Sequence, residues 1–131
     1  MNNKFHTLYI HMHTITELIQ KINTAVEDIQ YNTEPKKLYD PIRYILSIGG
    51  KRIRPLLMLM GYNLYRDDVD PIINNALALE TYHNFTLLHD DLMDKSDMRR
   101  GNPTVHKKWN DNTAILSGDT MLIMAYELFN K

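Results

Sequence analysis

The stretch IINNALALETYHNFTLLHDDLMDK (residues 72–95) is the longest segment of the chain in which a helical pattern continues without a break. It is mostly apolar as far as Leu92, and a loop marked by Asp67, Asp68 and Pro71 precedes it. Residues of these types favour turns and helix starts. Nowhere in the chain do apolar and polar residues alternate over enough positions to indicate a strand. We therefore expect an all-α protein.

The segments on either side of this helix also favour helices. Apolar residues recur at helical spacing over residues 10–31. Further helices are expected over residues 37–47, from Pro55 into the apolar run that ends at Leu64, and over residues 112–129. The last of these is apolar on more than one face, so it requires burial on several sides. The chain is therefore either a fragment, or a partner covers that surface.

The composition limits the possible classes of protein. A chain of 131 residues forms one domain at most. Its formal net charge of −1 gives no indication of a nucleic-acid partner. It has no cysteine, which excludes disulfides and thiolate metal sites. No apolar run reaches the roughly 18 to 20 residues of a membrane span, and the first residues do not form a signal peptide, so the cytoplasm is the expected location.

Asp90, Asp91 and Asp94 form the most informative cluster in the sequence. On a helix, positions 90 and 94 are one turn apart on the same face, and position 91 lies beside them. Like charges at this spacing destabilise a helix, and no basic residue lies one turn upstream to offset them. Carboxylates are ligands that Mg²⁺ prefers, together with substrate phosphate oxygens. The alternative is a solvated acidic face near a helix end.

Two basic clusters flank this helix in the sequence. GGKRIRP (residues 49–55) combines glycines before a helix start with Lys51 and Arg54, which are three residues apart and could share a face. Arg99 and Arg100 precede Gly101, and two adjacent arginines can contact different ligands. His83 lies two turns before Asp90 and could donate to a phosphate. Taken singly, each basic cluster is explained by a surface turn and the histidine by a structural role; together with the aspartates they indicate a metal–diphosphate site.

These motifs together resemble the trans-isoprenyl diphosphate synthase (polyprenyl synthetase) family, of the farnesyl and geranylgeranyl diphosphate synthase type. The resemblance covers about residues 40–130 and rests on five motifs in the family's order: GGKRIRP (49–55), ETYH (80–83), LHDDLMD (88–94), RRGNPTVH (99–106) and SGD (117–119). It implies an isoprenoid-synthase-type helical bundle, of which residues 1–131 are the amino-terminal part of a single domain. It also implies a magnesium-dependent prenyltransferase that is a homodimer.

The resemblance assigns roles to individual residues. Asp90 and Asp94 are expected to ligate Mg²⁺ bound to an allylic diphosphate, with Asp91 supporting them. Arg99 is expected to contact the same diphosphate. The diphosphate of isopentenyl diphosphate is expected to be held by Gly50, Lys51, Arg54, His83 and Arg100.

The family's chain-length positions, four and five residues before the first aspartate, are Thr86 and Phe85 here. Phe85 is expected to block a long product and Thr86 to leave some room, which predicts a C15 or C20 product with C15 slightly preferred. The alternative is that Phe85 simply packs in the core.

The family carries a second aspartate-rich motif on a later helix, and residues 1–131 contain no equivalent. We therefore expect these residues to be the first part of a longer enzyme and to be inactive alone. Two alternatives remain: a non-catalytic regulatory subunit, and a fragment of a class I terpene cyclase, which shares the aspartate motif but does not explain GGKRIRP or the arginine pair.

Overall fold

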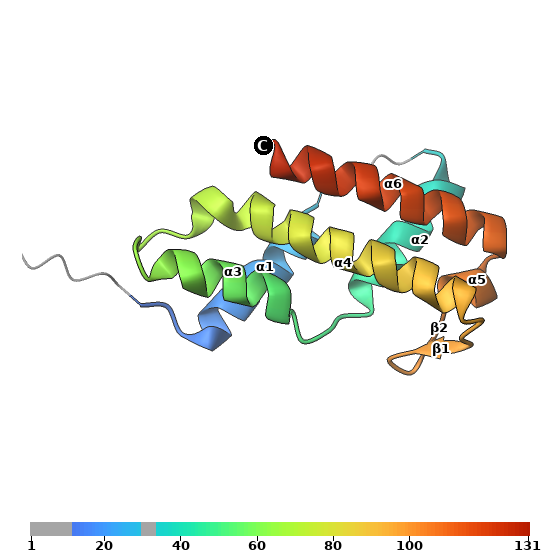
Figure 1. Cartoon of the computed structure of the whole chain (residues 1–131), viewed down its shortest axis with the longest axis horizontal. Coiled ribbons are helices and arrows are strands. Elements are labelled where there is room, and N and C mark those ends of the chain that lie inside the picture. Colours follow the sequence, from blue (N-terminus) through green and yellow to red (C-terminus); the bar gives the residue numbers. More distant parts are fainter. Residues whose placement is uncertain (1–11, 30–33) are drawn as a thin grey trace, which may run out of the picture.

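The computed structural model describes residues 12–29 and 34–131, and these residues form an all-α fold as expected (Figure 1). The described part contains six α-helices, one turn of 3-10 helix (η1, Asp70–Ile72) and one small hairpin. The helices are α1 (Ile15–Glu27), α2 (Lys36–Ser47), α3 (Ile53–Asn63), α4 (Ile73–Met93), α5 (Val105–Lys108) and α6 (Asp111–Phe129). The single-turn helix α5 was not predicted.

The expected long helix over residues 10–31 is shorter where the structure describes it. Thr14 caps α1, because its hydroxyl accepts a hydrogen bond from the Glu17 amide while the Glu17 carboxylate accepts one from the Thr14 amide. This reciprocal capping box fixes the helix start at Ile15. The helix ends at Glu27, so residues 12–14 and 28–29 are not helical, and residues 10, 11, 30 and 31 of the expected range lie outside the described residues.

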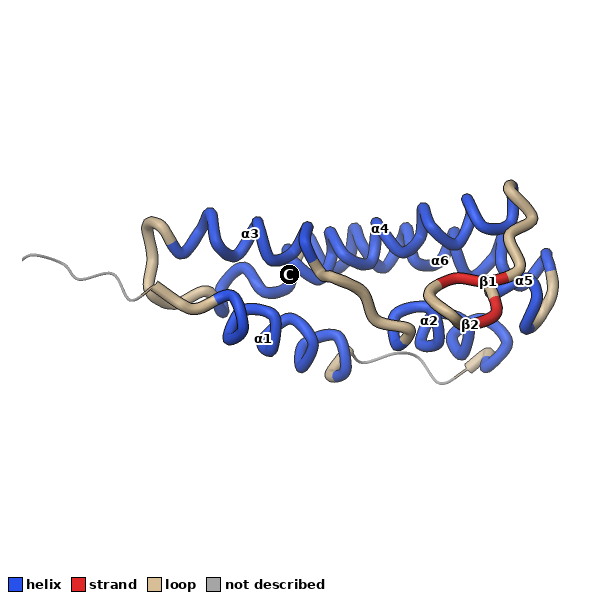
Figure 2. The backbone as a smooth tube through the Cα atoms, turned by 90° about the horizontal axis from the view of Figure 1, so that it is seen from below, coloured by secondary structure: helices blue, strands red, loops and turns tan. Residues whose placement is uncertain are grey.

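Helix α4 is the centre of the bundle. Helix α6 runs along it, α3 lies beside its first half, and α1 and α2 pack from below in the view of Figure 2. Side chains from every layer meet in one apolar core, which includes Leu18, Ile22, Ile42, Ile45, Leu59, Ala76, Leu88 and Met121. Because α4 is packed against α1, α2, α3 and α6, the side chains that it presents between these contacts have fixed positions.

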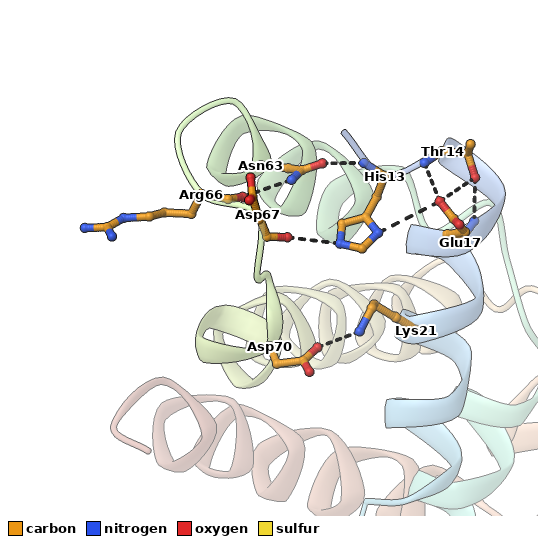
Figure 3. A network of polar contacts seen from close by, with 8 residues as sticks. All are labelled: His13, Thr14, Glu17, Lys21, Asn63, Arg66, Asp67 and Asp70. Carbon is orange, nitrogen blue, oxygen red and sulfur yellow. Dashed lines mark hydrogen bonds and ion pairs between the residues drawn. The ribbon is translucent and has the colours of Figure 1, made fainter. Parts of the chain in front are cut away.

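Polar contacts tie the start of α1 to the connection between α3 and α4 (Figure 3). The His13 amide donates to the Asn63 side-chain oxygen at 2.8 Å, and the His13 ring lies 3.1 Å from the Asp67 carbonyl oxygen. Lys21 forms an ion pair with Asp70 at 2.7 Å. These contacts hold α1 against the end of the bundle that is farthest from the aspartate cluster.

The expectation that the chain has no strand is wrong at one place. Residues Met98–Arg99 (β1) and Asn102–Pro103 (β2) pair as an antiparallel hairpin. Its two loop residues, Arg100 (φ 51°) and Gly101 (φ 78°), both have the positive φ of a type I′ turn. Strands of two residues are too short to produce an alternating pattern in the sequence, which is why they were missed. Tyr44 of α2 anchors the hairpin by donating to the Pro103 carbonyl oxygen at 2.7 Å.

Helix α6 buries one face against α4 and leaves the other exposed within the described part of the chain. The exposed apolar side chains are Ile115, Leu116, Ile123, Tyr126 and Phe129. This agrees with the sequence pattern, which is apolar on more than one face of this helix. None of the helices in the described residues is both long enough and apolar enough to cross a membrane.

Candidate active site

A pocket of about 430 Å³ lies where the loop before α3, the middle of α4 and the hairpin turn meet. Its lining includes all five residues expected to bind one diphosphate, although they are spread over residues 50–100. The lining residues are Gly50, Lys51, Arg52, Ile53, Arg54, Glu80, His83 and Arg100. Lys51 precedes the first residue of α3, so it does not share a helical face with Arg54 as expected; both nevertheless line the pocket.

Arg54 and His83 meet inside this pocket. The Arg54 Nη1 atom lies 3.0 Å from His83 Nε2. Burial lowers the pKa of His83 below its ordinary value, and the neighbouring Arg54 lowers it further. His83 is therefore neutral at neutral pH, and the positive charge of the pocket comes from Lys51, Arg54 and Arg100. An anion that enters the pocket would meet three cations and a neutral imidazole.

Gly50 allows Arg100 to reach the pocket. A Cβ atom built on Gly50 would lie 2.6 Å from Arg100 Nη1, which is closer than any side chain tolerates. Any other residue at position 50 would therefore displace the guanidinium. Burial lowers the pKa of Arg100, and the next cause is the neighbouring charge of Arg99. Crowding of positive charge of this kind is relieved when an anion binds.

Arg99 and Arg100 point in different directions, as expected for two adjacent arginines that contact different groups. Arg100 turns toward Gly50, whereas Arg99 turns toward the end of α4. There its Nε and Nη2 atoms donate to the two carboxylate oxygens of Asp91 at 2.5 and 2.8 Å. This pairing raises the pKa of Arg99 above its ordinary value. The partner that offsets the acidic cluster is thus eight residues downstream of Asp91, not one turn upstream.

The three aspartates have different environments. Asp91 is buried beneath Arg99, whereas Asp90 and Asp94 are exposed at the last turn of α4. Two of the three carboxylates are therefore accessible to solvent, and one is paired within the fold. A helix carboxyl terminus carries partial negative charge, which adds to that of the two carboxylates and favours a bound cation.

The donor set fits Mg²⁺ only if a substrate completes it. Among the residues that the structure describes, no three His, Cys, Asp or Glu side chains converge on one point. Asp90 and Asp94 can supply two carboxylate oxygens, and Mg²⁺ is commonly bound by one or two carboxylates plus substrate phosphate oxygens. Two carboxylates of this kind would need further oxygen ligands from elsewhere to hold the ion.

Phe85 and Thr86 lie one turn before the aspartates. The Phe85 ring is half-buried against the core and packs edge-on to Tyr82 and His89, with ring centroids 5.6 and 4.9 Å away. The Thr86 hydroxyl donates to the His83 carbonyl oxygen at 2.8 Å. His89 lies directly over Gly118 of α6, where a side chain would overlap its ring. These contacts give His89 a packing role between α4 and α6.

Sequence reasoning assigned no role to two residues at the back of the basic pocket. Arg52 and Glu80 form a buried ion pair at 2.5 Å. Both stand inside motifs that carry the resemblance, GGKRIRP and ETYH. The available signal was a charged residue in an apolar stretch: Glu80 lies in the buried run of α4, and a buried carboxylate requires a partner.

The family model described as polyprenyl synthetase matches residues 35–131. The chain belongs to the polyprenyl synthetase family. A geranylgeranyl diphosphate synthase of Methanosarcina mazei is 40% identical over 110 residues, which are 84% of this chain and 34% of that protein. A geranylfarnesyl diphosphate synthase of Natronomonas pharaonis is 37% identical over 130 residues, covering 86% of this chain and 38% of that protein.

Solved structures show the same similarity. A crystal structure of a geranylgeranyl pyrophosphate synthase superimposes with a TM-score of 0.87 and 53% identity, over 91% of this chain and 36% of that one. The family and the all-α fold of isoprenyl synthases, both predicted from the sequence, are confirmed. The chain spans about a third of the length of the curated relatives described above.

Proposed function

We propose that this chain is the amino-terminal part of a magnesium-dependent prenyltransferase that joins isopentenyl diphosphate to an allylic diphosphate. The observation that carries the proposal is the basic pocket next to an acidic helix end. The pocket gathers Lys51, Arg54, His83 and Arg100, while Asp90 and Asp94 stand two to three turns along the same helix from His83. Two diphosphates, one bound by cations alone and one through a metal, account for both features.

The basic pocket would hold isopentenyl diphosphate. Arginine's planar guanidinium suits phosphate oxygens, and lysine adds a point charge. Arg54 supplies one such group from α3 and Arg100 supplies another from the hairpin turn, where it lies against Gly50. Neutral His83 offers an N–H to the same ligand. The pocket would thereby orient the double bond of isopentenyl diphosphate toward the end of α4.

The end of α4 would hold the allylic diphosphate. Asp90 and Asp94 would bind Mg²⁺, which supplies electrostatic stabilisation of the diphosphate leaving group. Arg99 would contact the same group, since Asp91 engages only two of the five N–H donors of a guanidinium. Asp91 is thus a positioning residue in this proposal, because it aims Arg99 from beneath.

In the reaction the C–O bond of the allylic substrate breaks and its electron pair leaves with the diphosphate. The double bond of isopentenyl diphosphate attacks the resulting cation, a new C–C bond forms, and a proton is lost. The chain's own residues hold both diphosphates and stabilise developing negative charge on the leaving group, which is the largest contribution that such a site makes.

We further propose that the active enzyme includes a second aspartate-rich segment beyond these residues, as the family does, and that residues 1–131 are inactive without it. A short product, C15 or C20, is proposed from Phe85, and the geranylgeranyl names of several relatives favour C20 of the two. A homodimer and a cytoplasmic location stay predictions.

The test is a condensation assay on the full-length product of the gene. Isopentenyl diphosphate is incubated with Mg²⁺ and, separately, with C5, C10 and C15 allylic diphosphates. Formation of a longer prenyl diphosphate supports the proposal. Release of diphosphate from the allylic substrate without consumption of isopentenyl diphosphate would indicate a cyclase, and no reaction with any partner would favour a regulatory subunit.

The Phe85→Ala variant of the full-length enzyme is expected to make a longer product. Removing the ring opens space one turn from the aspartates, beside Tyr82 and His89. Product length is read by mass spectrometry of the dephosphorylated prenols. The matched control is Phe129→Ala, because Phe129 is exposed at the end of α6 beside Asn75, at the other end of α4. An unchanged product distribution would mean that Phe85 serves only to pack the core.

A further inference from the structure

We propose that Arg52 and Glu80 are positioning residues that set the spacing of the basic pocket and hence its affinity for isopentenyl diphosphate. The inference rests on the function proposed above. Arg52 and Glu80 are only 5% and 3% exposed, and both lie at the back of the pocket. They join its two walls: Arg52 stands between Lys51 and Arg54, and Glu80 lies one helical turn before His83.

The Arg52 guanidinium links three separate helices. Its Nη1 atom donates to Glu80 of α4 at 2.5 Å, its Nη2 atom to the Leu46 carbonyl oxygen near the end of α2 at 2.9 Å, and its Nε atom to Asn23 of α1 at 3.3 Å. One side chain therefore holds the loop before α3 against the rest of the bundle. Arginine's fixed fork of donors makes such a three-way contact rigid.

Glu80 is held in turn from its own helix. Asn84, which is fully buried one turn later, donates to the Glu80 carboxylate at 3.0 Å and to its carbonyl oxygen at 2.8 Å. The Glu80 carboxylate thus accepts hydrogen bonds from both Asn84 and Arg52. Its position along α4 is fixed, and so is its distance from His83.

The backbone at Arg52 explains why this contact matters to the pocket. Arg52 has φ 50° and ψ 30°, a left-handed conformation that is uncommon for a residue with a side chain. It is also the residue from which α3 starts, and the chain changes direction there. Lys51 lies on one side of this bend and Arg54 on the other. The buried contacts of Arg52 keep the bend in place, and the bend determines where both cations point.

Stability alone does not account for such a pair. Replacing a buried ion pair by apolar residues of similar size is often neutral or stabilising, whereas removing one partner leaves an uncompensated buried charge. The effect of the pair on the position of the pocket residues can therefore be separated from the cost of an unpaired buried charge. A double replacement removes the geometric link while leaving no buried charge, and it reports on positioning more cleanly than either single replacement.

The experiment compares the full-length wild type with the Arg52→Met/Glu80→Leu double variant in the condensation assay. A shift of the pocket's cations by about 1 Å is expected to raise KM for isopentenyl diphosphate about 10²-fold. KM for the allylic diphosphate should stay within about twofold, because its proposed contacts are at the end of α4. The Glu80→Gln variant keeps an oxygen that can accept a hydrogen bond from Arg52. Its KM for isopentenyl diphosphate should therefore lie between that of the wild type and that of the double variant.

The control is Lys21→Gln/Asp70→Asn, which removes an exposed ion pair at the opposite end of the bundle (Figure 3). Its two KM values should match those of the wild type. The inference is overturned if the double variant keeps the wild-type KM for isopentenyl diphosphate, or if both KM values rise together. Should the double variant not fold, the same comparison is made on Glu80→Gln. A wild type that condenses no substrate would instead refute the proposed function.

Discussion

Replacing Asp90 with asparagine in the full-length enzyme is expected to lower kcat about 10³-fold, because a bound metal contributes several kcal/mol to stabilising the leaving group and each 1.36 kcal/mol is tenfold in rate. Asparagine has nearly the same size but no charge. Asp90 is exposed on the last turn of α4, so the substitution removes no core contact. The measurement is the steady-state rate at saturating concentrations of both substrates.

Glu27→Gln is the matched control for this prediction. Glu27 is also an exposed carboxylate on the last turn of a helix, but it lies at the end of α1. Its variant should keep the wild-type rate, and circular dichroism should show wild-type helix content for both variants. An Asp90→Asn enzyme with wild-type kcat would exclude the acidic helix end as the metal site.

The Arg54→Met variant is expected to bind isopentenyl diphosphate more weakly by roughly 10- to 150-fold, since a hydrogen bond to a charged group contributes about 1.5–3 kcal/mol. Arg54 is exposed on the first turn of α3 and contacts His83 at 3.0 Å. Methionine retains the aliphatic part of the side chain, so the fold should be unaffected. The effect is measured as KM for isopentenyl diphosphate at a saturating allylic substrate.

Arg66→Met provides the control for Arg54→Met. The Arg66 side chain extends away from the bundle near the connection between α3 and α4 (Figure 3). Removing it changes the net charge by the same amount as Arg54→Met, and KM should not change. If both variants raise KM equally, the effect comes from overall charge and not from the pocket, and the assignment of Arg54 fails.

The longer helices were predictable because each carries a local signal, which the four-residue helix α5 lacks. Residues 112–129 and 72–95 are long apolar segments bounded by turn residues, and the structure places α6 and α4 within one or two residues of those limits. The hairpin was not predictable in the same way. Two-residue strands leave no periodic pattern, and the turn depends on a positive φ at Arg100 that a non-glycine residue does not signal.

The candidate site was also predictable only in part. Residue types and spacing identified the acidic cluster and both basic clusters, and the pocket contains the basic residues that were expected there. The ion pairs between residues far apart in the chain could not be predicted. Asp91 is buried by Arg99 from the hairpin, and Arg52 is matched by Glu80 across the bundle. Such pairs depend on how helices pack, which no local pattern specifies.

The metal requirement of each substrate tests the two-site account most directly. The basic pocket carries its own positive charge, whereas the acidic helix end would repel a diphosphate until Mg²⁺ neutralises it. Calorimetry on the full-length enzyme, with EDTA or with Mg²⁺, compares isopentenyl diphosphate with an allylic diphosphate analogue that cannot ionise. We expect isopentenyl diphosphate to bind in both buffers and the allylic analogue to bind only with Mg²⁺. Equal binding of the allylic analogue in EDTA, or loss of isopentenyl diphosphate binding there, would contradict the account.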